Sequence, residues 1–360
     1  MGLTKAGQRN VMIDLWKFVY AWFIVFYHFY SGIGDYFHSG YYCVDFFLIA
    51  AGVFFFRGLE KDPEAPPQKH IFKRFWRFFP WSFTAFIFAF VVIRVVINGS
   101  PVRALITALS KDIWEILLVK MNGMNDNVGL VNSPAWTLSS MFLVEIVMVG
   151  LFRYRRAFVH VIVPVSLIVG FGYWCHIDDA ASPLWNGFTT FAVVRTWLAY
   201  CGAYYCLRLS EYLRDADLNR RGELALTALE TLCYAFAIVA VLFVEARYYQ
   251  WCTILAFFIA IAISLSGHSL WNRALQKASG VTKFLGAFSL SIYLIHRPVT
   301  RYFEMLYPDP EVLYTHVAMV VPVILVCSLA HFVLVSGLIR LWEKNRKKIG
   351  SWFITPKSEA

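Results

Sequence analysis

Apolar segments of close to 20 residues recur along the whole chain, and they constrain its fold more than any other feature. A helix needs about 20 apolar residues to cross a bilayer, and in lipid the backbone polar groups must be satisfied within the protein. Of the 360 residues, 59% are apolar and only 16% are charged, whereas a soluble domain carries about 25% charged residues. The sequence predicts an all-α, polytopic membrane protein of about ten transmembrane helices. We expect the spans at residues 11–30, 41–57, 78–98, 136–152, 157–175, 188–207, 224–244, 251–266, 284–300 and 312–339.

One further apolar segment, residues 102–120, carries too many charges for a span. Its apolar residues recur at helical spacing, which is typical of an amphipathic helix lying along the membrane surface. The charged residues are Arg103, Lys111, Asp112, Glu115 and Lys120.

The distribution of Lys and Arg predicts the orientation. The net charge of +10 could suit nucleic acid, but that function needs the basic residues on one accessible face. Here they lie in short clusters between apolar runs. With the N-terminus in the cytoplasm, the cytoplasmic segments hold 24 of them and the outer segments seven. This bias predicts that both termini are cytoplasmic, with one transmembrane domain (residues 1–345), a basic tail (346–360) and no nucleic-acid partner.

The seven cysteines form no CxxC pair, so we expect neither a disulfide framework nor a metal site. The first apolar run contains Asp14 and Lys17 and has no small-residue cleavage site after it. It is therefore interpreted as a retained span and not as a signal peptide.

Ionisable side chains inside a span are costly and usually face the bundle interior. Helical geometry places Asp14, Lys17 and His28 on one stripe of the first span, about 21 Å long. We expect His28 in the outer half of the membrane, where a neutral imidazole could take a proton from a hydroxyl. The alternative is that His28 only hydrogen-bonds another helix.

Asp45 enters the membrane at the start of the second span. If it lies near His28, its carboxylate could orient the imidazole and stabilise the protonated ring; otherwise it is an interfacial aspartate facing water. Gly52 lies on the same helical face and would allow close helix packing.

Three basic residues precede the third span: Lys73, Arg74 and Arg77. Arg74 and Arg77 are three residues apart and share a helix face. Guanidinium groups fork onto phosphate oxygens, so the group would suit a phosphorylated cofactor. The alternative is topological, because cytoplasmic loops are generally basic.

Arg195 lies in the middle of a span and needs a partner, for which Glu145 is a candidate. In the ninth span, Ser289, Tyr293 and His296 share one helical face. A substrate site and a structural hydrogen-bond network explain these residues equally well.

Five motifs in this order resemble the bacterial membrane acyltransferase-3 family. The family's patterns are a basic residue, an aspartate, an arginine and a histidine in the first span; Gly-x-x-Gly-Val-Asp-x-Phe-Phe-x-x-Ser-Gly; Arg-x-x-Arg-x-x-Pro; Trp-Ser/Thr-Leu-Ser; and Leu-Gly-x-x-Ser-x-x-x-Tyr-Leu-x-His-x-Pro. The matching residues are 9–28, 40–52, 74–80, 136–139 and 285–298. The chain departs from the pattern at Lys17, Cys43, Ala51 and Met141.

The resemblance implies a ten-helix bundle in the bacterial cytoplasmic membrane. It implies transfer of an acyl group, most often acetyl, from cytoplasmic acyl-CoA to a hydroxyl of an extracytoplasmic glycan or glycolipid, without a metal. The family's catalytic histidine maps to His28, which Asp45 would assist, and its donor-site arginines map to Arg74 and Arg77. Membrane lipids, acyl-CoA and the glycan are then the partners, and a homodimer is one assembly that the sequence leaves open.

The main alternative is a transporter or flippase for a glycolipid or small anion, because intramembrane Lys17, Glu145, Arg195 and His296 would also suit a translocation path. A catalytically inactive sensor is a third interpretation. Release of free CoA would separate the enzyme from both.

Overall fold

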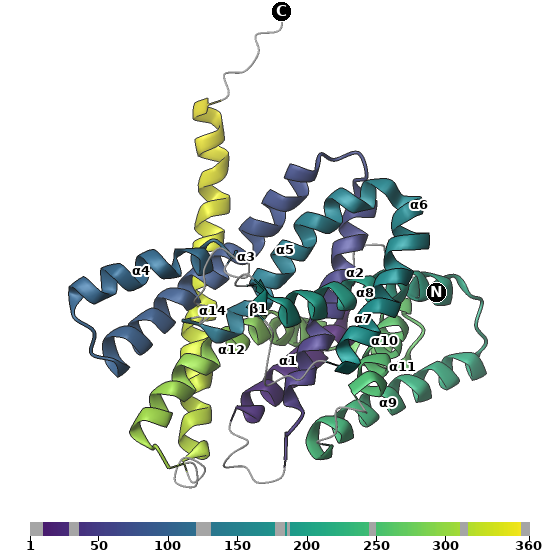
Figure 1. Cartoon of the computed structure of the whole chain (residues 1–360). Coiled ribbons are helices and arrows are strands. Elements are labelled where there is room, and N and C mark those ends of the chain that lie inside the picture. Colours follow the sequence, from purple (N-terminus) through teal and green to yellow (C-terminus); the bar gives the residue numbers. More distant parts are fainter. Residues whose placement is uncertain are drawn as a thin grey trace, which may run out of the picture.

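Helices make up almost all of the described chain (Figure 1). The computed structural model describes residues 10–28, 36–119, 131–176, 184–185, 188–244, 250–309 and 316–353. The α-helices are α1 (Val11–Tyr27), α2 (Cys43–Lys61), α3 (Pro67–Phe90), α4 (Val102–Ile116), α5 (Trp136–Leu151), α6 (Arg155–Ala157), α7 (Val163–His176), α8 (Thr190–Asp215), α9 (Arg220–Phe243), α10 (Gln250–Ser266), α11 (Leu270–Gln276), α12 (Ser279–Leu306) and α14 (Val317–Phe353). Short 3-10 or π segments adjoin them: η1 (Gly40–Tyr42), η2 (Val91–Ile97), η3 (Ser133–Ala135), η4 (Phe152–Tyr154) and η5 (Phe158–Ile162). The two strands, β1 (Leu184–Trp185) and β2 (Phe188–Thr189), form one antiparallel pair.

Each predicted span contains a helix, but several boundaries differ from the prediction. The helix of the third predicted span starts at Pro67, because proline is favoured in the first turn of a helix and the basic residues that follow continue it. The helix α14 runs on to Phe353, past residue 345, and the division into a transmembrane domain and a basic tail stays a prediction. The sequence also did not predict α11, which is bent by 60° from α10. Gly267 lies between them with φ +85°, a conformation that glycine adopts without steric cost.

Five helical stretches within the described ranges are long and apolar enough to cross a bilayer, and a sixth is counted if the bent pair of α10 and α11 is one span. These findings indicate a multi-pass membrane protein. Three further helices of the core are not among the five. The helix α1, at 17 residues, is too short, and α8 and α12 carry ionisable side chains that lower their mean hydropathy. The five stretches are Gly40–Lys61, Pro67–Ile97, Ser133–Gly172, Arg220–Phe243 and Val317–Asn345.

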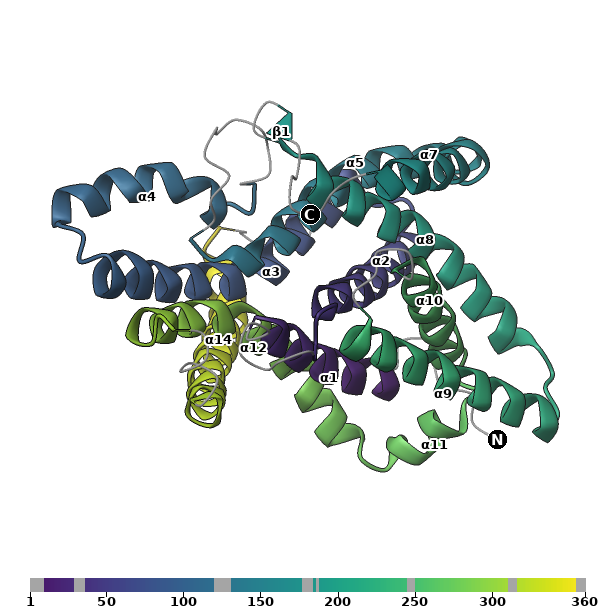
Figure 2. The ribbon, with the colours of Figure 1, turned by 60° about the horizontal axis from the view of Figure 1, so that its bottom comes forward.

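Close helix contacts build the core around α1, α2, α8 and α12, which lie together in Figure 2. A Cβ atom on Gly286 of α12 would lie 2.5 Å from Cβ of Asp14 in α1. The two helices therefore approach each other so closely that only glycine fits at this position without a shift. Gly52 does the same between α2 and α8, 2.7 Å from Cβ of Ala203, which confirms its predicted packing role.

The helix α4 is amphipathic, as predicted, and lies at the periphery of the structure beside α3 (Figure 2). Its apolar residues point outward, with Val102 and Ile106 72% and 67% exposed. Its acidic residues Asp112 and Glu115 are buried against the protein. An exposed apolar face of this kind suits the membrane interface.

Polar contacts tie helix ends together at both ends of the bundle. At one end, Glu60 in the last turn of α2 pairs with Arg155 of α6 (2.9 Å) and with Arg208 of α8. At the other, the backbone N–H of Phe37 donates to the carbonyl of Leu242 near the end of α9 (3.1 Å). The start of α2 therefore lies beside the end of α9.

Candidate functional site

Two histidines from different helices stack at the end of α1. His28 is the C-cap residue of α1, and its ring lies against His296 of α12 with centroids 5.1 Å apart and planes inclined by 29°. His28 is partly exposed, whereas His296 is completely buried. The structure thus brings together two ionisable residues that are 268 positions apart in the chain.

Of the other predicted residues of α12, Tyr293 lies near this pair. The ring of Tyr293 is 6.1 Å from that of His296, centroid to centroid, and 6.0 Å from that of Phe47 in α2. Ser289 is buried, and its hydroxyl donates to the carbonyl of Gly286 in its own helix (3.0 Å). The predicted shared face is confirmed for Tyr293 and His296, while the Ser289 contact is internal to the helix.

Arg195 forms a buried ion pair with Asp45. Its Nε donates to Oδ1 (2.7 Å) and its Nη2 to Oδ2 (2.8 Å), and Nη2 also donates to the carbonyl of Tyr41 (2.9 Å). Both residues are nearly inaccessible. The prediction that Arg195 pairs with Glu145 is wrong, because α2 and not α5 presents the carboxylate at the level of Arg195.

Asp45 therefore places both carboxylate oxygens on a guanidinium group. Among the described residues, the ring of His28 contacts the rings of Tyr27 and His296. No contact joins Asp45 to His28 in the described part of the chain, so the predicted support of His28 by Asp45 stays a prediction.

Glu145 is the partner of Arg74. Nε of Arg74 donates to Oε2 of Glu145 (2.7 Å), its Nη2 donates to Oε1, and the hydroxyl of Tyr200 donates to Oε1 as well (2.7 Å). Burial and these contacts hold α3, α5 and α8 together. The guanidinium of Arg74 is thus committed to a carboxylate, which is not the open phosphate fork that the sequence predicted.

Lys73 and Arg77 are exposed in the first half of α3, in contrast with Arg74. The i, i+3 spacing of Arg74 and Arg77 is confirmed as helical, but the two side chains differ in burial.

Asp14 and Lys17 form the first part of the predicted polar stripe. Asp14 is buried, and its Oδ1 is 3.9 Å from Nζ of Lys17. The ammonium of Lys17 also lies 5.2 Å from the ring centroid of Phe54 in α2. These contacts at the start of α1 stabilise its packing on α2 and α12.

A cavity of about 260 Å³ lies between α2, α7, α8 and α10. The Asp45–Arg195 pair borders it, and the rest of its wall is almost entirely apolar, with Leu198, Leu255 and Phe258 among the residues. Its volume and lining suit an aliphatic chain.

The sequence did not single out Asn132, which compensates for a proline. Pro298 in α12 has no N–H, so the carbonyl of Leu294 lacks its usual helical donor. Nδ2 of Asn132 donates to this carbonyl (3.0 Å). Glu115 of α4 in turn accepts from the backbone N–H groups of Val131 (2.8 Å) and Asn132 (2.9 Å). The peripheral helix α4 is thereby linked to α12, two residues before His296.

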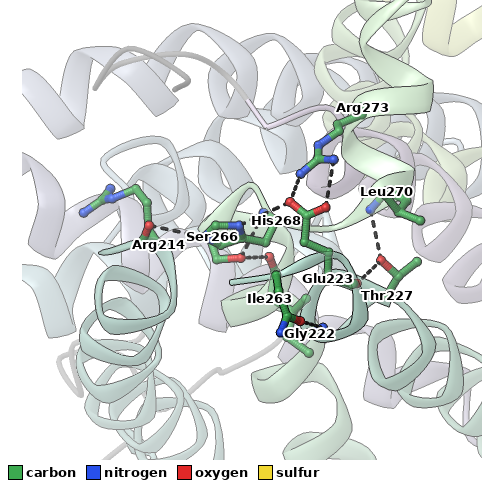
Figure 3. Close-up of polar contacts among 10 residues, drawn as sticks. Arg214, Gly222, Glu223, Thr227, Ile263, Ser266, His268, Leu270 and Arg273 are labelled. Atoms are coloured by element: carbon green, nitrogen blue, oxygen red, sulfur yellow. Dashed lines mark hydrogen bonds and ion pairs between the residues drawn. The ribbon is translucent and has the colours of Figure 1, made fainter. Parts of the chain in front are cut away.

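A second unpredicted cluster surrounds Glu223 at the start of α9 (Figure 3). Arg273 of α11 forms a bidentate ion pair with its carboxylate, and Nδ1 of His268 lies 3.8 Å from Oε1. The other ring nitrogen of His268 is 3.2 Å from the carbonyl of Arg214. This cluster joins α8, α9 and α11 at the bend that follows α10, and its role is structural.

Comparisons with known proteins agree with the order of motifs. The model of the acyltransferase-3 family, described as an acyltransferase domain, matches residues 10–339. No curated protein and no solved structure matches the chain. The match extends from the N-cap of α1 into α14 and includes the paired histidines and both buried ion pairs. The chain therefore belongs to the acyltransferase-3 family of membrane acyltransferases.

Proposed function

We propose that this protein transfers an acyl group, most often acetyl, from cytoplasmic acyl-CoA to a hydroxyl of an extracytoplasmic glycan or glycolipid. The observation that carries the proposal is the stacking of His28 on His296 in a chain of an acyltransferase family. A histidine is suited to take a proton from a hydroxyl or to carry an acyl group.

The proposed topology has ten spans and both termini in the cytoplasm. The excess of Lys and Arg on one side supports it. So do the contacts between helix ends, because the end of α2 meets α6 and the last turns of α8, as alternating helices require. In this orientation Glu60 lies at the cytoplasmic end, and the histidines lie toward the outer end of α1. The setting would be a bacterial cytoplasmic membrane.

The donor would bind beside the cytoplasmic half of α3. Its phosphates would contact Lys73 and Arg77, which are exposed there, while Arg74 is held by Glu145 and keeps the start of α3 fixed against α5. No metal takes part in this proposal.

The chemical step would occur beside His28. The acceptor oxygen bonds to the acyl carbon, the carbon–sulfur bond breaks, and the CoA sulfur leaves with the proton of the hydroxyl. His28 would either take that proton first or carry the acyl group between donor and acceptor. Acceptors would arrive from the outer side, where α1 ends.

The donor site can be tested by binding acetyl-CoA to the full chain in nanodiscs. Replacing Arg77 with Ala removes a charge-assisted contact of about 1.5–3 kcal/mol, so the Kd should rise about tenfold or more. Arg156 is an exposed arginine of the same end of the bundle, and Arg156→Ala should leave the Kd unchanged. An equal response of both variants would show only a general charge effect, and no binding by folded wild-type protein would refute the donor proposal.

A further inference from the structure

The contacts of His296 fix which of its ring nitrogens carries the proton. Nδ1 lies 3.2 Å from the carbonyl oxygen of Ile292, one turn earlier in α12. A carbonyl oxygen can only accept a hydrogen bond, so Nδ1 must be the protonated nitrogen. In the neutral ring Nε2 then has a free lone pair and no hydrogen.

This lone pair has no partner among the described residues. Nε2 of His296 is completely buried and makes no hydrogen bond there. A buried polar atom without a partner is costly, and such atoms are rare enough to require an explanation. An acceptor-only nitrogen would be satisfied by a hydroxyl donor.

A second buried histidine of the same protein shows the contrast. His331 of α14 has a partner for each ring nitrogen, since Nδ1 lies 3.0 Å from the hydroxyl of Ser291 and Nε2 lies 2.9 Å from that of Thr84. A histidine that serves only packing can thus be fully satisfied in this bundle. His296 is not, and it is also the ring on which His28 stacks.

We infer that His296 is a second catalytic histidine, whose Nε2 takes the proton of the acceptor hydroxyl. The inference rests on the proposed function and assigns one of its steps. The hydroxyl proton moves to Nε2, the hydroxyl oxygen bonds to the acyl carbon, and the bond from that carbon to its leaving group breaks. The proton then passes to the leaving atom, which is the CoA sulfur in direct transfer or a ring nitrogen of His28 if that ring carries the acyl group. Thus His28 holds or carries the acyl group, and His296 activates the acceptor.

The test uses two replacements that separate the ring nitrogens. In His296→Asn the side-chain amide can still donate to the carbonyl of Ile292, but nothing replaces Nε2. In His296→Gln an amide group reaches the place of Nε2 and can form a hydrogen bond without taking a proton. Loss of a general base costs about 10²–10⁴-fold in rate, so we expect both variants to lose at least 100-fold in kcat. Binding of acetyl-CoA and the thermal midpoint should stay close to those of the wild type.

The assay is CoA release from acetyl-CoA by the full chain in nanodiscs, supplied with cell-envelope glycan of the source organism as acceptor. His331→Asn is the matched control, since it also alters a buried histidine; it should lower the thermal midpoint and leave kcat within a few fold. If wild-type protein releases CoA and His296→Asn or His296→Gln does so at a similar rate, His296 is not the base. If folded wild-type protein releases no CoA, the proposed function itself fails.

Nitrogen NMR offers a readout that does not depend on activity. In histidine-labelled protein, the signals lost in His296→Asn should be those of a neutral ring with a pyridine-like Nε2. A hydrogen on Nε2 would overturn the assignment.

Discussion

The ion pair between Asp45 and Arg195 allows a quantitative test of the packing of α2 on α8. Both side chains are nearly inaccessible, and two hydrogen bonds join them. Removing one partner of a buried pair leaves an uncompensated charge and costs about 3–5 kcal/mol. We therefore expect Asp45→Asn and Arg195→Met each to lower the free energy of unfolding by about this amount.

The double variant should be far less destabilised than the sum of the two single variants. With both partners replaced, neither charge of the pair is left buried without the other, and the loss includes the bond from Arg195 to the carbonyl of Tyr41, about 1 kcal/mol. The two single costs sum to about 6–10 kcal/mol against about 1 kcal/mol for the double variant. The expected coupling is therefore about 5 kcal/mol or more, above the roughly 0.5–3 kcal/mol that is usual for residues in contact. The measurement is unfolding of the purified protein in mixed detergent micelles. The control is Arg155→Met. Arg155 pairs with Glu60, but 57% of the arginine side chain is exposed, so its replacement should cost less than about 1 kcal/mol.

Additive effects of the two single variants would refute this account of the pair. Activity gives a second comparison. If Asp45 serves only Arg195, acyl transfer by the double variant should recover together with stability. If stability recovers and activity does not, Asp45 or Arg195 acts on the chemistry beyond its role in the ion pair.

Three further predictions concern packing and hydrogen bonds. Gly286→Ala places a methyl group against α1 and should cost about 1–3 kcal/mol, whereas Gly280→Ala in the same helix meets nothing within 4 Å; equal unfolding midpoints for the two variants would contradict the close approach. Asn132→Ala should cost about 1–3 kcal/mol because it leaves the buried carbonyl of Leu294 without a donor. The cost should shrink in a Pro298→Ala background, where the backbone N–H of residue 298 can donate to that carbonyl. An unchanged cost would refute the compensation. Glu230 is buried and accepts from two serine hydroxyls, so Glu230→Gln should be tolerated better than Glu230→Leu, which removes both acceptors; thermal midpoints in the reverse order would show that the carboxylate charge is needed.

The helices were largely predictable because lipid requires long apolar segments, and such segments are visible in the sequence without knowledge of their neighbours. Helix ends were less predictable. The basic start of α3 continues the helix beyond the apolar run, and α11 depends on the backbone conformation at Gly267, which has no signature in hydropathy.

The helix faces that carry the ionisable residues were predictable, whereas the partners of these residues were not. Spacing along one helix identifies a polar face, but it contains no information on which other helix meets that face. For this reason Arg195 was matched with Glu145, although α2 presents Asp45 to it. Asn132 could have been sought from one signal, since Pro298 inside a helix frees the carbonyl four residues earlier, but the chain offers several amides that could fill the role.

The most direct test of the acyl-transfer proposal compares CoA release from acetyl-CoA by wild-type protein and His28→Ala in nanodiscs. We predict steady release by the wild type with acceptor present, and a loss of at least 100-fold in His28→Ala with acetyl-CoA binding retained. Folded wild-type protein that binds or moves its ligand without releasing CoA, or a His28→Ala variant with unchanged turnover, would contradict the proposal.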